Sequence, residues 1–346
     1  MYSQLRRAVS WLGLGLLVLV MQGCSQDKQV YHLTGSTMGT YYSIKVILPQ
    51  DSQLKPDFLL NEIDLRLERV NDQMSTYRKD SELSRFNQSR TDTPMTVSQD
   101  TAFVITEALR LNKLTSGALD VTMGPLVNLW GFGPEARPET VPSKALIAER
   151  RKMTGTQFLH VVSPTQLVKT NPDLYVDLSS IAKGFGVDVI AEYFDDLGIK
   201  DYLVEIGGEV RTRGVNDAGV PWRIAIEKPV PGQPAVQQIV SISDHAIATS
   251  GDYRNYFEEN GRRYSHTIDP ATAMPINHRL VSVSVINQSC MTADGLATGL
   301  MVMGPEKGLA LAEKEGLAVY MIIKTDDGFE SRYSSAFKPY LAVEGE

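Results

Sequence analysis

The chain has 346 residues, of which 42% are apolar and 22% charged, and its formal net charge is −7. This length suits one large or two modest domains, and the composition is that of a globular protein with a sizeable core rather than a disordered chain. The acidic balance argues against a general nucleic-acid surface, because such surfaces are basic.

The N-terminus has the pattern of a secretory signal. Arg6 and Arg7 precede an apolar run over residues 11–21, which is too short to span a bilayer. The run ends in Met21-Gln22-Gly23-Cys24. Small residues before a cysteine are similar to a bacterial lipoprotein cleavage box, in which Cys24 becomes lipid-modified, although such boxes usually have leucine where this chain has Met21. An ordinary secretory signal with an incidental cysteine is the alternative.

The only other cysteine is Cys290. If Cys24 carries lipid, no internal disulfide is possible, even in an oxidising compartment. Two distant cysteines also argue against a zinc or iron–sulfur site.

Helices and strands are expected along the whole mature chain. Residues 25–34 have the character of a tether. In the first half we predict a strand over 41–48, a helix over 58–70, and a helix over 99–116 with Ser98 as its N-cap. Residues 133–143 contain three prolines and are predicted to form a loop or lid.

The second half mixes hairpins with isolated helices. The pattern predicts strands over 174–177, 202–206, 210–214, 222–227, 238–243, 253–258, 280–286 and 318–323, and helices over 181–197, 293–303 and 307–315. Gly207-Gly208 is expected to join two of these strands, residues 249–252 to form a turn, and residues 229–234 a loop. The mixture argues for an α+β fold rather than a doubly wound parallel sheet.

Residues 291–299 present a carboxylate and a hydroxyl on one helical face. With Thr292 as the N-cap, Asp294 and Thr298 lie one turn apart. Such hard oxygen ligands suit Mg²⁺, with waters and substrate phosphates completing its shell. The alternative is that Asp294 only complements the positive end of the helix.

Residues 175–184 are predicted to end a strand and begin a helix that Ser179 and Ser180 cap. Exposed N–H groups at such a terminus attract anions, and Lys183 in the first turn adds a positive charge. Gly184 and Gly186 lie inside the helix and do not form a dinucleotide fingerprint. An ordinary capped helix with a solvated lysine is the alternative.

Two further segments carry candidate chemistry. His266 follows a predicted strand beside the Asp269-Pro270 turn and could act as a general base near neutral pH, or be a structural histidine. Residues 116–133 contain glycines that permit close approach of a ligand. Trp130 or Phe132 there could line a flat ring system, or the segment could be a turn over a hydrophobic cluster.

Together these segments resemble the ApbE family of FAD:protein FMN transferases, and the match covers nearly all of the mature chain. The motifs that carry the resemblance are Gly35-Ser36-Thr37-Met38-Gly39-Thr40, Met74-Ser75-Thr76-Tyr77, Gly117-Ala118-Leu119-Asp120-Val121-Thr122, Asp177-Leu178-Ser179-Ser180-Ile181-Ala182-Lys183-Gly184, Gly207-Gly208, Ser265-His266-Thr267-Ile268-Asp269-Pro270 and Thr292-Ala293-Asp294-Gly295-Leu296-Ala297-Thr298.

The resemblance implies an α+β fold of mixed sheets with packed helices, related to the T-fold. This domain is expected over residues 35–346, after a signal peptide over 1–23 and a lipid-anchored tether over 24–34. The implied reaction uses Mg²⁺ and FAD as substrate, attaches FMN through a phosphoester to a Thr or Ser of a target flavoprotein, and releases AMP.

The resemblance also implies roles for particular residues. The metal ligands map onto Asp294, Thr298 and a main-chain oxygen near Ser180, which makes Asp294 catalytic, and His266 matches a family histidine suited to activating the acceptor hydroxyl. The FAD contacts map onto Met38, Tyr77, Ala118, Leu119, Asp120, Asp177, Lys183 and Ile268. The family varies at Tyr77 and at Lys183, so the carry-over is weaker at those two positions.

A lipid anchor fits targets that are membrane-associated flavoprotein subunits of the redox-pump or electron-transfer type. The expected location is the periplasmic side of a bacterial membrane, with the inner membrane favoured. An FAD pyrophosphatase that uses water as acceptor is the nearest alternative. A non-catalytic flavin-binding or solute-binding lipoprotein is another, although simple binding needs no metal together with a base.

Overall fold

The computed structural model describes residues 28–134, 140–230, 235–252, 256–259 and 262–342. Its strands are β1 Lys28–Thr37, β2 Thr40–Pro49, β3 Met95–Thr96, β4 Leu159–Ser163, β5 Gln166–Lys169, β6 Asp201–Ile206, β7 Glu209–Arg213, β8 Trp222–Glu227, β9 Val236–Ile242, β10 Ala246–Gly251, β11 Tyr256–Glu259, β12 Arg262–Ser265, β13 Ile268–Asp269, β14 Met274–Pro275, β15 Leu280–Asn287, β16 Ala318–Lys324 and β17 Phe329–Tyr333. Its helices are α2 Pro56–Met74, α3 Glu82–Gln88, α4 Gln99–Leu114, α5 Gly124–Leu129, α6 Lys144–Arg151, α7 Ala182–Asp196, α8 Cys290–Met303 and α9 Pro305–Glu315, with 3₁₀ turns η2 Thr156–Phe158 and η3 Ser335–Tyr340.

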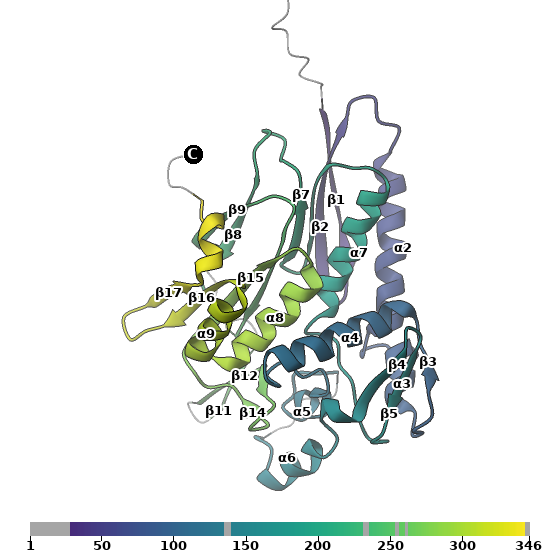
Figure 1. The fold of residues 1–346 in the computed structure, drawn as a ribbon, viewed down its shortest axis with the longest axis vertical. Coiled ribbons are helices and arrows are strands. Elements are labelled where there is room, and N and C mark those ends of the chain that lie inside the picture. Colours follow the sequence, from purple (N-terminus) through teal and green to yellow (C-terminus); the bar gives the residue numbers. More distant parts are fainter. Residues whose placement is uncertain (1–27, 135–139, 231–234, 253–255, 260–261, 343–346) are drawn as a thin grey trace, which may run out of the picture.

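An antiparallel sheet of eight strands organises the described part of the chain, in the order β1-β2-β6-β7-β10-β15-β16-β17. Helix α7 packs on β6 and β7, and α8 packs on β10 and β15, so the two helices lie side by side on one face (Figure 1). This arrangement confirms the predicted α+β class.

Alternation along β16 shows how the sheet separates two cores. Val319 and Met321 point into the core beneath the helices, whereas Tyr320 and Ile322 point into the core formed with β8, β9 and η3. Because side chains of a strand alternate between its faces, both faces of this strand are apolar and buried. The β8–β9 hairpin therefore covers the face opposite α8.

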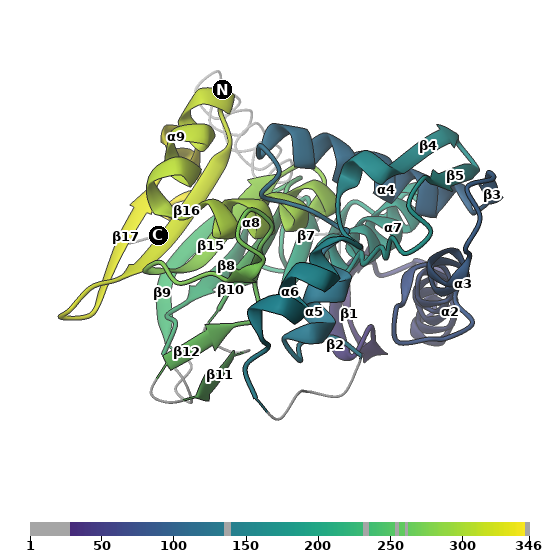
Figure 2. The ribbon, with the colours of Figure 1, turned by 90° about the horizontal axis from the view of Figure 1, so that it is seen from below.

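A smaller antiparallel sheet of order β3-β5-β4 lies beside α3 and α4. Figure 2 shows it at the opposite side of the molecule from β16, β17 and α9. Lys169 at the end of β5 is only 1% exposed, and its ammonium donates to the carbonyl oxygens of Asn87 and Leu174 at 2.8 and 3.2 Å. Burial lowers the pKa of this lysine to about 8.

Most of the predicted elements are present. The helix predicted over 99–116 is α4, and Ser98 caps it by accepting a hydrogen bond from the Thr101 N–H. Strands β6 and β7 meet at Gly207-Gly208, as expected, and both glycines have positive φ, which suits a tight hairpin turn.

Several local predictions are corrected. Residues 28–34 belong to β1, which pairs with β2 along its whole length, so this part of the predicted tether is in the folded domain. Residues 249–251 are the end of β10 rather than a turn. Helix α8 begins at Cys290, and its N-cap is Ser289, which accepts from the Thr292 N–H, so Thr292 is not the cap. The cap before α7 is Ile181 without a side-chain hydrogen bond, so Ser179 and Ser180 do not cap it.

Residues 174–177 are predicted as a strand but form none. The side chain of Asn87 replaces a neighbouring strand, because it accepts from the Val176 N–H and donates to the Val176 carbonyl, both at 2.8 Å. The Asp177 N–H donates to the carbonyl of Val121. These bonds satisfy the backbone of a segment that lies under the site.

The predicted signal peptide, Cys24, parts of the loops predicted at 133–143 and 229–234, and part of the strand predicted at 253–258 lie outside the described residues. Among the helices that the structure does describe, none has both the length and the apolar composition needed to cross a membrane.

Candidate functional site

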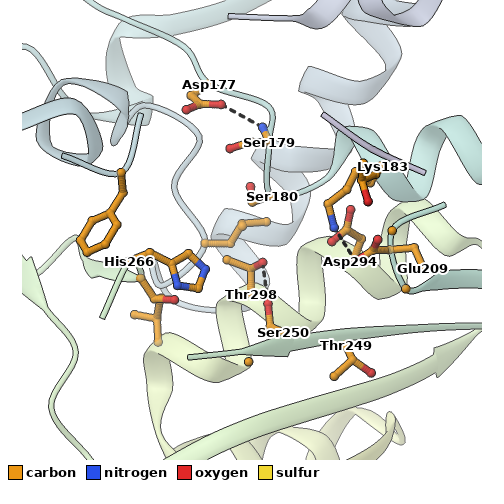
Figure 3. A pocket seen from close by; sticks show the side chains of 18 of the residues that line it. Asp177, Ser179, Ser180, Lys183, Glu209, Thr249, Ser250, His266, Asp294 and Thr298 are labelled. Atoms are coloured by element: carbon orange, nitrogen blue, oxygen red, sulfur yellow. Dashed lines mark hydrogen bonds and ion pairs between the residues drawn. The ribbon is translucent and has the colours of Figure 1, made fainter. Parts of the chain in front are cut away.

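A cavity of about 750 Å³ lies where α7 begins, beside α8 and the β6–β7 turn. Its wall brings together segments that are far apart in the sequence: the loop at 118–124, the start of α7, the middle of α8 and the segment at 266–270. Figure 3 shows Asp294 and Thr298 pointing into it, with Lys183 and Glu209 on one side and His266 on the other.

Asp294 and Thr298 project from the same face of α8, as their spacing predicts. One carboxylate oxygen of Asp294 accepts a hydrogen bond from the Gly184 N–H at 3.0 Å, which connects α8 to the first turn of α7. The Thr298 hydroxyl lies 3.1 Å from that of Ser250 on β10. Burial raises the pKa of Asp294 to about 7, against the opposing effect of the Lys183 ammonium.

Lys183 is held by a residue that the sequence analysis did not single out. Its ammonium lies 2.5 Å from Oε1 of Glu209 at the start of β7. Glu209 is 2% exposed, and its other carboxylate oxygen is buried without a hydrogen-bond partner among the described residues. Burial raises the pKa of Glu209, and the lysine opposes that effect. The carboxylates of Glu209 and Asp294 thus share a single ammonium.

The feature of the sequence that could have pointed to Glu209 is its position directly after Gly207-Gly208. An acidic residue that follows a tight turn is most often solvated, because carboxylates are rarely buried without a partner. Here the turn brings the side chain inward, toward a lysine on another element.

The segment before α7 contributes Asp177 and Ser180 to the cavity wall. The Asp177 carboxylate accepts from the Ser179 N–H at 2.9 Å. Burial raises the pKa of this carboxyl, and the hydrogen bonds from Ser179 counteract the rise. At the start of α7 the Ala182 N–H donates to the Leu178 carbonyl and the Gly184 N–H donates to Asp294, so the positive end of the helix dipole and the Lys183 ammonium are what this end of the cavity offers to an anion.

The cavity is also lined by four residues for which FAD contacts are predicted: Tyr77, Ala118, Leu119 and Asp120. Asp120 accepts from both the N–H and the hydroxyl of Thr122, at 2.7 and 2.6 Å, which fixes its loop. Tyr77 is 69% exposed, so its ring borders the mouth of the cavity.

His266 and Ile268 line the far side of the cavity. The ring of Phe132 meets that of His266 edge-on, with 6.2 Å between the centroids. Phe132 lines the cavity, whereas Trp130 is fully buried in a separate apolar cluster and its indole N–H donates to the carbonyl of Ala273. Of the two aromatics considered for contact with a flat ring, only Phe132 is placed to make it.

Met38 is the one predicted contact that does not line the cavity. It occupies the β1–β2 turn with a φ of 50°, and its side chain packs against α7 at Gly186. Its position supports the helix that carries Lys183, rather than the cavity wall.

The cavity fits the donor set predicted for Mg²⁺. No three His, Cys, Asp or Glu side chains of the described chain come together as metal ligands. However, Mg²⁺ is usually held by one or two carboxylates, with water and phosphate oxygens completing the shell. Hard donors of this kind are present in Asp294, the Thr298 hydroxyl and a main-chain oxygen at Ser180. The buried carboxylates of Asp294 and Glu209 share the charge of one lysine, Lys183, which leaves negative charge for a cation to balance.

Comparison with known proteins adds independent findings. The model of the ApbE family matches residues 38–321. A Vibrio cholerae protein named FAD:protein FMN transferase is 59% identical over 333 residues, which cover 96% of this chain and 99% of the relative. The structure of the flavin transferase ApbE from Vibrio cholerae superposes with a TM-score of 0.85 at 58% identity, covering 91% of this chain and 100% of that one. The apo structure of the Pseudomonas stutzeri flavinyl transferase ApbE gives a TM-score of 0.84 at 41% identity, covering 91% and 98%.

Proposed function

This chain belongs to the ApbE family, and from that premise we propose that it attaches FMN to a Ser or Thr hydroxyl of a target flavoprotein with the help of Mg²⁺. It is an FAD:protein FMN transferase, as are its close relatives. The observation that carries the proposed mechanism is the single cavity whose wall holds Lys183, Asp294, Thr298 and His266.

The proposed reaction is a phosphoryl transfer. The acceptor hydroxyl oxygen attacks the FMN-side phosphorus of FAD and forms a new P–O bond. The bond from that phosphorus to the bridging oxygen breaks, and AMP leaves with the bridging oxygen. The proton of the hydroxyl passes to a ring nitrogen of His266, a residue type suited to general base catalysis near pH 7.

Different residues of the cavity bind different parts of FAD. The positive end of the α7 dipole and the Lys183 ammonium attract the pyrophosphate. Phe132, Tyr77 and Ile268 offer apolar and aromatic surface to the ring systems of FAD. Positioning the phosphorus against the acceptor hydroxyl is expected to supply much of the acceleration, as in other phosphoryl transfers.

Asp294, Thr298 and the main chain at Ser180 would hold Mg²⁺. When bound there, Mg²⁺ supplies Lewis-acid polarisation and neutralises charge on the pyrophosphate. Asp294 keeps its orientation through the hydrogen bond from Gly184, and Glu209 holds the Lys183 ammonium close to the same carboxylate.

The test is to incubate the mature domain with FAD, Mg²⁺ and a panel of candidate acceptor domains. Intact-mass analysis follows each acceptor while chromatography measures AMP and free FMN. An acceptor that gains one FMN, with an equal amount of AMP, supports the proposal. AMP and free FMN without any modified acceptor across the panel would instead support the FAD pyrophosphatase.

We also propose that the protein is lipid-anchored through Cys24 on the periplasmic side of the membrane, with the inner membrane favoured. Its targets there are membrane-associated flavoprotein subunits of the redox-pump or electron-transfer type. The cysteine at the end of the apolar N-terminal run supports this placement. Cys24→Ser should release the protein from the membrane fraction, and continued membrane association would contradict the anchor.

A further inference from the structure

The cavity extends beyond the residues assigned to FAD and the metal. It continues past the Gly207-Gly208 turn to Leu203 and Glu205 of β6, and then along β8. None of these residues has a role in the mechanism above, and the pattern in which they line the cavity differs between the two strands.

On β6 the lining residues alternate, since Leu203 and Glu205 line the cavity and Val204 is fully buried on the other face. On β8 five consecutive residues, Arg223–Glu227, line it. Because successive side chains of a strand point to opposite faces, a cavity on one face is lined by every second residue. Because consecutive residues of β8 line the cavity, the cavity runs along the edge of this strand rather than over one of its faces.

Among the described residues, no other strand pairs with that edge. Strand β8 pairs with β9 from Trp222↔Ile242 to Glu227↔Val236, and within the described residues these two strands form a sheet of their own. Alternate residues over Ile224–Ile226 therefore direct their N–H and C=O groups away from β9. Such an edge is a template for one more strand.

We propose that the target protein binds as an added strand along this edge of β8, over Ile224–Ile226, and so brings its hydroxyl to His266. This inference rests on the proposed function, since it concerns the acceptor of that same reaction. The occupant is an extended polypeptide segment that precedes or follows the acceptor Ser or Thr.

The size of the cavity supports an extended segment. A volume of about 750 Å³ is that of a small-molecule site, so a folded acceptor cannot enter it with FAD in place. A segment drawn into the cavity loses water around its backbone, and buried N–H and C=O groups require new partners. The β8 edge supplies those partners without regard to side-chain identity, as in other cases of β-strand addition.

Hydrogen exchange tests the proposal directly. An acceptor domain from the transfer assay, with its modified Ser or Thr replaced by Ala or Val, is added to the protein with FAD and Mg²⁺. We expect slower amide exchange in peptides that cover β8 and unchanged exchange in β17, which is an end strand of the main sheet. Unchanged exchange in β8 in a complex that forms would overturn the proposal. So would full protection by FAD alone, because β8 would then belong to the FAD site.

Proline substitution gives a second test with a built-in control. In an antiparallel strand, neighbouring residues direct their N–H groups to opposite edges, so Ile224→Pro and Ala225→Pro remove donors from different edges. The variant that loses the donor toward β9 should be destabilised. The other should fold normally, bind FAD as wild type does, and raise the KM for the acceptor by about tenfold, the effect of losing one hydrogen bond of about 1.4 kcal/mol.

The outcomes separate the two proposals. If no acceptor gains FMN in the transfer assay, the proposed function fails. If acceptors are modified but every folded proline variant keeps the wild-type KM, the strand-addition proposal fails alone. If both variants unfold, hydrogen exchange decides.

Discussion

Lys183 on α7 lies 2.5 Å from Glu209 on β7, and the same ammonium also attracts the buried carboxylate of Asp294 on α8. One cation thus links the two helices to the sheet at the base of the cavity. Its pKa is raised because the attraction of the two carboxylates outweighs the cost of burial.

Replacing Glu209 should therefore affect both stability and metal use. Glu209→Gln removes the charge that holds Lys183, which leaves the ammonium to pair with Asp294 and compete with Mg²⁺. We expect half-maximal transfer to need several-fold more Mg²⁺, and the free energy of unfolding to fall by about 1–3 kcal/mol. Urea denaturation and a Mg²⁺ titration measure the two effects.

The matched control is the double variant Lys183→Met/Glu209→Gln, which removes both charges. Its loss of stability should be smaller than the sum of the two single losses, because neither charge is left without its partner. Additive losses would contradict the coupling.

Asp294→Asn tests the predicted metal ligand. The amide keeps the size of the side chain and an oxygen for the Gly184 N–H, but removes the charge that binds a cation. Transfer should fall by at least about 100-fold, as when one group that stabilises a transition state is deleted. Calorimetric titration with Mg²⁺ should show weakened binding. Near-normal rates at saturating Mg²⁺ would be incompatible with this role.

His266→Ala should slow transfer without a matching loss of FAD affinity. A positioned general base contributes about 10²–10⁴-fold to rate, so the decrease is expected in this range. The Kd for FAD, followed by flavin fluorescence, should change much less. His160→Ala on the exposed face of β4 is the control and should leave both quantities unchanged. Equal effects of His266→Ala on rate and affinity would argue against the base role.

The buried Lys169 predicts a pH dependence of stability. Its pKa is about 8 in the folded protein and 10.5 in a model peptide, so between these values the unfolded state binds more protons. Stability from this group therefore rises as pH increases from 8 to 10.5, by at most about 3 kcal/mol. The difference in unfolding free energy between wild type and Lys169→Met should follow this curve. Lys144→Met, at the exposed start of α6, is the control for the loss of one positive charge.

Two glycines of α7 make a matched pair. A Cβ at Gly184 would lie 2.4 Å from the carbonyl oxygen of Cys290, which is backbone and cannot move aside. A Cβ at Gly186 would lie 2.7 Å from the flexible end of Met38. Gly184→Ala should lower the unfolding free energy by about 2 kcal/mol or more despite the gain in helix propensity, whereas Gly186→Ala should be near neutral. Thermal denaturation of both variants would show whether this ranking holds.

The sequence predicts that Asp294 and Thr298 share one face of α8, because they are one turn apart and helical spacing is a local property. The end of β10 is different. Residues 249–251 have the composition of a turn, yet they form the end of β10, a central strand of the main sheet. The Thr249 hydroxyl is hydrogen-bonded to that of Ser284 on the neighbouring strand, and the Ser250 hydroxyl is hydrogen-bonded to that of Thr298 on α8. Those partners come from tertiary packing, which local composition does not contain.

The candidate site shows the same difference between features that are local in the sequence and features that arise from tertiary packing. Most of the cavity residues stand in motifs that are continuous in sequence. The pairing of Glu209 with Lys183 depends on how β7 meets α7, and the role proposed for β8 depends on which strand edge is left unpaired. Both are properties of topology, so neither could be predicted from residue types and spacing.

Cys290 at the start of α8 is fully buried, its thiol lies 3.7 Å from the carbonyl oxygen of Val210, and burial raises its pKa well above the usual value. Thiolates, not thiols, react with maleimides and other electrophiles. In a form of the protein without Cys24, the one remaining thiol is therefore unreactive. A cysteine introduced at the exposed Ala225 of β8 would then be the only thiol that reacts with a fluorophore or spin label. The label would report binding of a ligand or acceptor at the cavity, and no further substitution would be needed.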